Sequence, residues 1–155
     1  MADLTHIDRT ILREIQKNAR ARLDDLADQT GVSVATVQRR LKSLRDRGVI
    51  ADEISVVSPE KAGFTMTFLI MVELERERLD QLDAFRRKVK AEPQIQQCYY
   101  ITGDADFALI ALARDMEDYQ FLTQRLFFED SNVKRFRTSV VMDRTKTGLH
   151  VPLED

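Results

Sequence analysis

The chain has 155 residues, of which 43% are hydrophobic and 32% charged, and these fractions are typical of a globular protein. The length allows one domain or two small ones. The net charge of −2 gives no indication of a nucleic-acid partner. No run approaches the roughly 20 consecutive apolar residues of a membrane span, and the N-terminus lacks the pattern of a signal peptide, so we expect no membrane partner. The single cysteine, Cys98, excludes an intrachain disulfide and favours a cytoplasmic location.

Residues 1–50 have apolar residues at helical spacing and predict a three-helix domain. Thr5 is expected to cap the first helix, because Asp8 follows three residues later as in a capping box. A second helix is expected from Leu23 to Thr30, where Gly31 ends it. The inward stripe of the first helix consists of Ile7, Ile11, Leu12 and Ile15.

Ser33 is expected to cap the third helix, and Gly48 to end it. From Gly31 to Arg47 there are five basic residues and one acidic residue, whereas the rest of the chain carries a net charge of −6. A compact positive segment on an otherwise acidic protein is typical of a DNA-contacting surface, although an ordinary solvated helix face would show the same charge. The inward face of this helix consists of Val34, Val37, Leu41 and Leu44.

The second and third helices together form a helix-turn-helix, which places its second helix in the major groove of double-stranded DNA. Arginine and glutamine can make paired hydrogen bonds with base edges, and the methyl groups of alanine and threonine can contact thymine. The residues expected outward at the N-terminal end of the third helix, facing the bases, are Ser33, Ala35, Thr36, Arg39 and Arg40, with Gln38 at the side. Those expected to meet phosphates further along are Lys42, Arg45 and Arg47.

The segment Val49–Val57 is rich in β-branched residues and predicts a strand or strand pair, and residues 58–63 then break the pattern. The sequence leaves open whether the segment is a wing of the DNA-binding domain or the start of a linker. We describe residues 51–63 as a β-linker.

Residues 64–142 follow the order β-α-β-β-α-β, the split unit of a ferredoxin-like sandwich, so the fold class is α+β. Residues 143–155 form a polar tail that we expect to be mobile, and Cys98 is expected to be a small core residue. The expected elements are a strand over 64–74, a helix from Arg78 to Ala91, strands Ile95–Ile101 and Phe107–Ala113, a helix capped by Asp115, and a strand Val133–Met142.

The strand Phe107–Ala113 is apolar at nearly every position, so the sheet is expected to present apolar side chains on both faces. The two helices of the unit can cover only one face. We expect a second copy of the protein to cover the other face, sheet against sheet. The alternative is an edge strand that the tail partly shields.

Four segments resemble the Lrp/AsnC (leucine-responsive and asparagine-responsive, or feast/famine) regulators. Asp8–Arg20 and Gly31–Ile50 resemble the family's DNA-binding domain, and Gln97–Phe107 and Arg137–Met142 resemble its sensor-domain signatures. The similarity covers nearly the whole chain, in order and with matching spacing.

The resemblance implies a nucleoid-associated transcriptional regulator in which a β-linker joins a winged helix-turn-helix to an effector-binding α/β domain. It also implies homodimers that often assemble into tetramers or octamers, and a response to an amino acid or related metabolite. We expect no cofactor, catalytic residue or metal, since no further cluster of Asp, Glu or His accompanies Asp104 and Asp106. In such proteins the effector binds between subunits near a Gly-Asp-x-Asp turn. The residues that this nominates are Tyr100, Gly103, Asp104, Asp106, Met116, Ser139, Val140 and Val141.

The turn can be interpreted in two ways. Gly103 lets backbone N–H groups point into one concavity that can hold an α-carboxylate, and Asp104 or Asp106 can accept hydrogen bonds from an α-ammonium group. Alternatively, Gly103 only permits the turn, and the aspartates satisfy its backbone.

Three rival functions fit less well. An RNA-recognition module has basic and aromatic residues on its inner strands, whereas Phe107–Ala113 has no basic residue and one aromatic. Tetrapyrrole decarboxylases, which the superfamily includes, rely on histidines around a large pocket, and the two histidines here, His6 and His150, lie near the chain ends. A metabolite sensor without DNA binding is disfavoured because the helix-turn-helix is complete.

Overall fold

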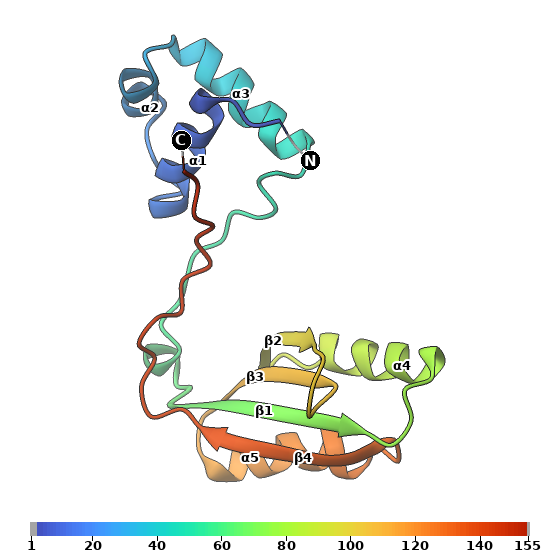
Figure 1. The fold of residues 1–155 in the computed structure, drawn as a ribbon. Helices are drawn as coiled ribbons and strands as arrows, with labels where there is room; N and C mark the ends of the chain where they lie inside the picture. The colour runs from blue at the N-terminus through green and yellow to red at the C-terminus, as the bar shows by residue number, and fades with distance from the viewer. Residues whose placement is uncertain (1–2, 155) are drawn as a thin grey trace. The chain divides into compact units, whose positions relative to one another are not determined.

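The computed structural model describes residues 3–154, and the chain divides into two compact units. The helical unit comprises residues 1–56 together with 146–155, and the sheet unit comprises residues 57–145 (Figure 1). No helix of the described chain is long and apolar enough to cross a membrane.

The helical unit contains the three predicted helices, α1 (His6–Lys17), α2 (Leu23–Thr30) and α3 (Val34–Asp46). The capping box at Thr5 is confirmed, because its hydroxyl accepts from the Asp8 N–H and the Asp8 carboxylate accepts from the Thr5 N–H. Gly31 ends α2 in the left-handed conformation, with φ of 69°. The three helices bury one small core, which includes Ile11, Leu12, Leu26, Ala27, Val37, Leu41 and Leu44.

The sheet unit has the predicted β-α-β-β-α-β order and an antiparallel four-stranded sheet with strand order β2-β3-β1-β4. Besides a short turn of 3-10 helix at Glu60–Ala62 (η1), its elements are β1 (Met66–Leu74), α4 (Leu79–Lys90), β2 (Ile95–Tyr100), β3 (Phe107–Ala113), α5 (Met116–Thr123), a π-helical turn η2 (Gln124–Phe128) and β4 (Val133–Val140).

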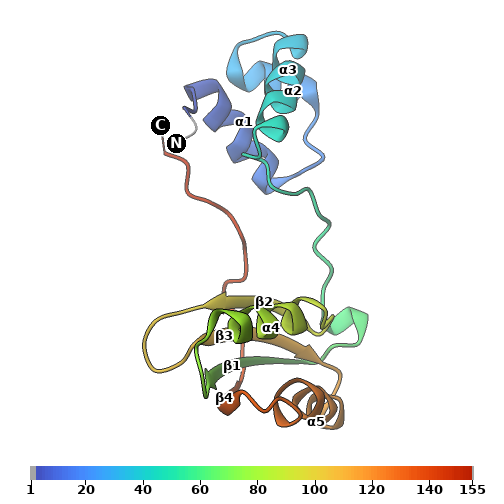
Figure 2. The same cartoon turned by 90° about the vertical axis from the view of Figure 1, so that its right-hand side faces the viewer.

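The core of this unit lies between one face of the sheet and the two helices. Helix α4 packs against β3 through Phe85 and Phe107, whose ring centroids are 4.8 Å apart, and Figure 2 shows α4 in front of β2 and β3. Helix α5 packs against β1 through Tyr119, which stacks on Phe68 at 4.0 Å. Every second side chain of β1 points into this core: Phe68, Ile70, Val72 and Leu74 are at most 5% exposed.

The strand expected over Val49–Val57 is wrong for the described chain. No regular structure forms there; Val49 and Ile50 pack against the helical core, whereas Val56 is 91% exposed. A strand needs a hydrogen-bonded partner, and no described segment pairs with this one. The β-branched pattern therefore marks a segment that is extended but unpaired.

The tail was expected to be mobile, and the structure differs from this expectation. Residues 143–154 form no helix or strand, but the tail is not free, because its last described residues belong to the helical unit and contact α1. Leu153 packs against the helical core. The polar composition concealed this contact, since most of its hydrogen bonds use the tail's backbone.

Candidate DNA interface and effector site

Helix α3 is fixed at its start by the predicted cap. The Ser33 hydroxyl accepts a hydrogen bond from the Thr36 N–H at 3.2 Å, and the two hydroxyls lie 3.0 Å apart. Both side chains take part in the cap, so any base contact from them must compete with it. The buried residues Val37, Leu41 and Leu44 hold the opposite face against α1 and α2.

The exposed face of α3 carries four of the predicted DNA-binding residues. At about 100° per residue, this face lies opposite Val37. These four are Ala35, Gln38, Arg39 and Lys42, all of them exposed, and the face also carries the acidic Asp46. Among the residues that the structure describes, neither Gln38 nor Arg39 has a hydrogen-bond or ion-pair partner, so both are available to base edges.

Arg40 is oriented differently from the prediction. Its Nη1 lies 3.3 Å from both carboxylate oxygens of Asp8 and 3.3 Å from the Thr5 hydroxyl, so the guanidinium points toward the start of α1. Arg40 lies 60° around the helix from Val37, so its side chain can point either inward or outward. The buried Asp8 carboxylate attracts the Arg40 guanidinium inward. Base reading by Arg40 stays a prediction, but it would require breaking this ion pair.

The environment of Asp8 makes it a stabilising anion. Burial alone would raise the pKa of this carboxyl, but hydrogen bonds from Thr5 and the positive charge of Arg40 outweigh burial and hold its pKa below the ordinary value of 3.8. Asp8 therefore stays ionised near neutral pH and joins α1 to the recognition helix.

Three further basic residues of this segment also have partners. Lys42 pairs with Asp46 at 2.6 Å, and Arg47 donates to the Asp3 carbonyl oxygen at 3.3 Å. Arg45 makes two hydrogen bonds of 2.9 Å to the Glu53 carboxylate. Exposed pairs of this kind exchange readily, so phosphate contacts remain open to all three residues.

A Glu53→Gln variant tests whether Arg45 meets phosphate. We expect tighter DNA binding and a steeper salt dependence, by up to about one on the log–log slope, because Arg45 loses an acidic competitor. Fluorescence polarisation on a duplex at several salt concentrations measures both. Glu60→Gln, which removes an exposed charge of the sheet unit, is the control. An unchanged slope for Glu53→Gln would exclude Arg45 as a phosphate contact.

The predicted effector residues fall into two groups along the sheet. Tyr100, Gly103, Asp104 and Asp106 lie at the turn between β2 and β3, where Phe107 pairs with Val72 of β1. Ser139 and Val140 lie near the other end of β1, where Val140 pairs with Phe68. Val72 and Phe68 are separated by about 13 Å along the strand.

The rest of the second group lies at the same end of the sheet. The N–H of Val141 donates to the Thr67 carbonyl oxygen at 2.9 Å, and Met116 begins α5 directly after β3. One chain therefore does not bring the predicted effector residues together into one pocket.

Within the turn, the two aspartates are in different environments. The carboxylate of Asp106 accepts a hydrogen bond from the Leu74 N–H at 2.6 Å, so it ties the turn to β1. The Asp104 side chain is exposed. Gly103 has φ of 115°, a backbone conformation that L side chains rarely adopt. Asp106 thus fits the interpretation in which the aspartates only bond to the backbone around the turn. Asp104 is the aspartate available to a ligand.

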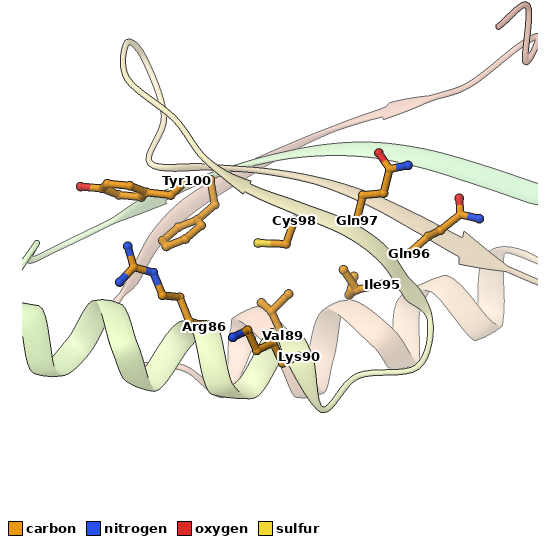
Figure 3. Close-up of a pocket in the computed structure, with 9 residues that line it drawn as sticks. Arg86, Val89, Lys90, Ile95, Gln96, Gln97, Cys98 and Tyr100 are labelled. Carbon is orange, nitrogen blue, oxygen red and sulfur yellow. The ribbon is translucent and has the colours of Figure 1, made fainter. Parts of the chain in front are cut away.

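An open groove of about 420 Å³ lies between α4 and β2 (Figure 3). Tyr100 lies in its wall, with the Arg86 guanidinium 5.1 Å from the ring centroid. Arg86 is not among the effector residues that the sequence nominates. The only signal for it was its position on α4, four residues before Lys90, the second cation of the groove.

Cys98 also lines this groove, which corrects its prediction as a core residue. It lies on edge strand β2, which α4 covers only in part. Desolvation raises the pKa of its thiol, although Arg86 partly opposes this. A thiol with a raised pKa is a poor nucleophile at neutral pH, so nothing here indicates catalysis.

Comparison with known families decides the identity of this arrangement. The ligand-binding domain of Lrp/AsnC proteins matches residues 67–150, and a winged helix-turn-helix DNA-binding domain matches residues 4–51. The chain belongs to the Lrp/AsnC family of transcriptional regulators. It is thus a DNA-binding regulator with a ligand-binding domain, not an enzyme.

Individual regulatory proteins are similar to this chain over almost its whole length. A helix-turn-helix transcriptional regulator of Sinorhizobium fredii is 45% identical over 152 residues, covering 98% of this chain and 90% of the relative. A Neisseria meningitidis regulator in complex with L-methionine superposes with a TM-score of 0.90 at 27% identity, covering 97% of each chain. A feast or famine regulatory protein from M. tuberculosis complexed with L-methionine has a TM-score of 0.84 at 26% identity, covering 94% of this chain and 97% of the other.

Proposed function

We propose that this Lrp/AsnC regulator binds a free amino acid between two of its subunits, and that the bound amino acid changes how the assembled protein fits its operator. The observation that carries the proposal is the separation of the two groups of predicted effector residues along β1. Because one chain holds them at opposite ends of the sheet, a pocket that uses both needs a second chain.

The outer face of the sheet supports self-association. Four of its side chains on the two central strands are apolar and at least partly exposed: Leu69, Met71, Ile110 and Leu112. No described segment of the sheet unit covers them. The alternative was shielding by the tail, but the tail from Lys146 onward belongs to the helical unit. A second copy, packed sheet against sheet, is the occupant that best fits a face of this shape and polarity.

An Ile110→Glu variant tests this interface. We expect it to shift the protein toward monomer, because the substitution places a charge at the centre of the buried face. Light scattering coupled to size-exclusion chromatography gives the mass. Leu79→Glu, which adds the same charge at a residue 77% exposed on the helix side, is the matched control and should leave the mass unchanged. An Ile110→Glu protein that keeps the wild-type mass would contradict the proposed face.

The chemistry of the turn supports an amino-acid ligand. Gly103 allows backbone N–H groups to converge on a carboxylate, and the exposed Asp104 carboxylate can accept from an α-ammonium group. Two structural relatives contain L-methionine. L-Methionine is therefore the first candidate in a screen of the amino acids.

An Asp104→Ala variant tests the turn. At a ligand concentration 100 times its Kd, the wild-type protein is expected to gain about 2.7 kcal/mol of stability, seen as a higher melting temperature. The variant should lose this shift and the effect of the ligand on DNA binding, while its ligand-free DNA affinity persists. Glu129→Ala, a loss of an exposed carboxylate elsewhere, should respond like wild type. An intact ligand response in Asp104→Ala would remove Asp104 from the site.

In a dimer, two copies of α3 would contact half-sites about one helical turn of DNA apart, or a multiple of it. The amino acid can change operator affinity only if it binds two arrangements of the subunits with different affinities. Polarisation titrations with and without the amino acid measure this coupling directly.

A further inference from the structure

The outer side of α1 carries an extended segment of the chain's own C-terminus. The Val151 N–H donates to the Gln16 side-chain oxygen at 2.7 Å, and the Gln16 side-chain nitrogen donates to the Val151 carbonyl oxygen at 3.2 Å. One glutamine thus holds both backbone groups of one tail residue. Such a reciprocal pair is how a side-chain amide grips an extended chain.

Two more contacts fix the direction of the tail. The His150 ring Nε2 lies 2.7 Å from the Gln16 backbone carbonyl oxygen. This carbonyl is one of the last four of α1, for which the helix itself provides no N–H donor. At the other end of α1, the Arg9 guanidinium donates to the Glu154 carbonyl oxygen at 2.8 Å. The tail therefore runs antiparallel to α1.

The distance between the two contacts along α1 matches the distance between them along the tail. Arg9 and Gln16 are two helical turns apart on the same side of α1, which separates them by roughly 10 Å. The stretch from Val151 to Glu154 spans roughly the same distance when extended. Pro152 lies between Val151 and Glu154, the two residues whose backbone groups bond to α1. The proline ring fixes its own φ and disfavours helical backbone at Val151, so the tail loses little conformational entropy on docking.

Leu153 adds an apolar anchor between the two polar ones. It is partly buried against the core of the helical unit, whereas Val151, Pro152 and Glu154 are exposed. Docking therefore buries one apolar side chain of the tail, in addition to making the hydrogen bonds with α1.

We propose that residues 150–154 form a detachable latch, with α1 as its receiving surface, which ties strand β4 of the sheet unit to the DNA-binding unit. With the latch docked, residues 141–149 connect β4 to α1 and can span at most roughly 30 Å. With the latch released, only the segment between α3 and β1 restrains the DNA-binding unit. Beyond Val49 and Ile50, which pack against the helical core, residues 51–65 can span at most roughly 50 Å. The inference goes beyond the proposed function and does not depend on the amino acid.

The latch has a functional consequence for DNA with two half-sites. A docked latch restricts how far each recognition helix can move from its β4, which raises the effective concentration of the second helix at the second half-site once the first is bound. Release should therefore weaken binding to paired half-sites and leave binding to a single half-site unchanged.

Hydrogen exchange of the full-length protein, resolved by residue, tests docking. The Val151 amide should be protected in the wild type. Its exchange should become about tenfold faster in Gln16→Ala, which loses the acceptor, and change less in Gln16→Glu, which keeps an acceptor oxygen. Val151→Ala keeps both backbone contacts, and its residue 151 should stay protected. Wild-type exchange at the rate of an unstructured peptide would overturn the proposal.

The double variant Gln16→Ala, Leu153→Ser tests the consequence. The probes are the duplex that the protein protects upstream of its own gene and the same duplex cut to one half-site. We expect roughly three- to tenfold weaker binding to the first and unchanged binding to the second. If the double variant lost the same affinity for both duplexes, the tail would only support the fold of the helical unit. If the double variant bound both duplexes as tightly as the wild type, the tail would not restrain the unit. Either result overturns the latch.

Discussion

The Asp8→Ala variant is expected to lower the free energy of unfolding of the helical unit by about 2–4 kcal/mol. The substitution removes the carboxylate that completes the capping box at Thr5, which costs about 1 kcal/mol, and it leaves Arg40 without its partner. Breaking a fully buried ion pair costs about 3–5 kcal/mol, and this pair costs less because the Arg40 side chain is 33% exposed. Chemical denaturation followed by circular dichroism gives the value.

A double-mutant cycle separates the ion pair from the cap. Arg40→Ala alone should also destabilise the unit, because it leaves the buried Asp8 carboxylate uncompensated. Removing both partners should cost less than the sum of the two single changes. Strictly additive losses would contradict a direct interaction between Asp8 and Arg40.

The same pair predicts a pH dependence. Because the pKa of Asp8 is lower in the folded chain than its ordinary value of 3.8, its stabilising effect is complete above that value and is lost as the pH falls through the folded pKa. The difference in stability between wild type and Asp8→Ala should therefore be constant near neutral pH and shrink below about pH 4. A difference that grew on acidification would have the wrong sign.

Replacing Arg39 with alanine is expected to weaken operator binding by about 1–3 kcal/mol, which is roughly 5- to 150-fold in affinity. Arg39 lies on the exposed face of α3 and, in the described chain, has no ion-pair partner to lose. The variant should therefore fold with wild-type stability. Polarisation titrations with specific and scrambled duplexes distinguish the loss of base reading from a general loss of charge.

Arg13→Ala, on α1, is the comparison for Arg39, since it removes the same charge outside the recognition helix. If Arg39 reads bases, its loss should reduce the preference for the specific duplex, whereas Arg13→Ala should leave that preference intact. Equal specific affinity of Arg39→Ala and wild type would exclude Arg39 as a reader.

The elements with one strong period could be predicted from the sequence to within a few residues. Helices α1 to α3 have apolar residues at helical spacing and clear caps at Thr5 and Ser33, and β1 alternates over its whole length. In each case the signal is local, because the residues that decide the structure are neighbours in the sequence.

The features that the sequence did not reveal depend on contacts between distant residues. Arg40 turns inward because of Asp8, 32 residues earlier, and Val151 is held by Gln16, 135 residues earlier. The strand pattern at Val49–Val57 requires a partner strand, which residues 3–154 do not supply. The groove beside α4 similarly depends on how far the edge strand β2 extends beyond that helix.

The most direct test of a DNA-reading α3 is the affinity of the full-length wild-type protein for a duplex from upstream of its own gene, titrated over a series of salt concentrations. We predict a logarithm of affinity that falls linearly with the logarithm of salt concentration, by about 0.9 for each phosphate contact, and a scrambled duplex of equal length that binds more weakly throughout. The absence of salt-sensitive binding to any duplex would contradict the account.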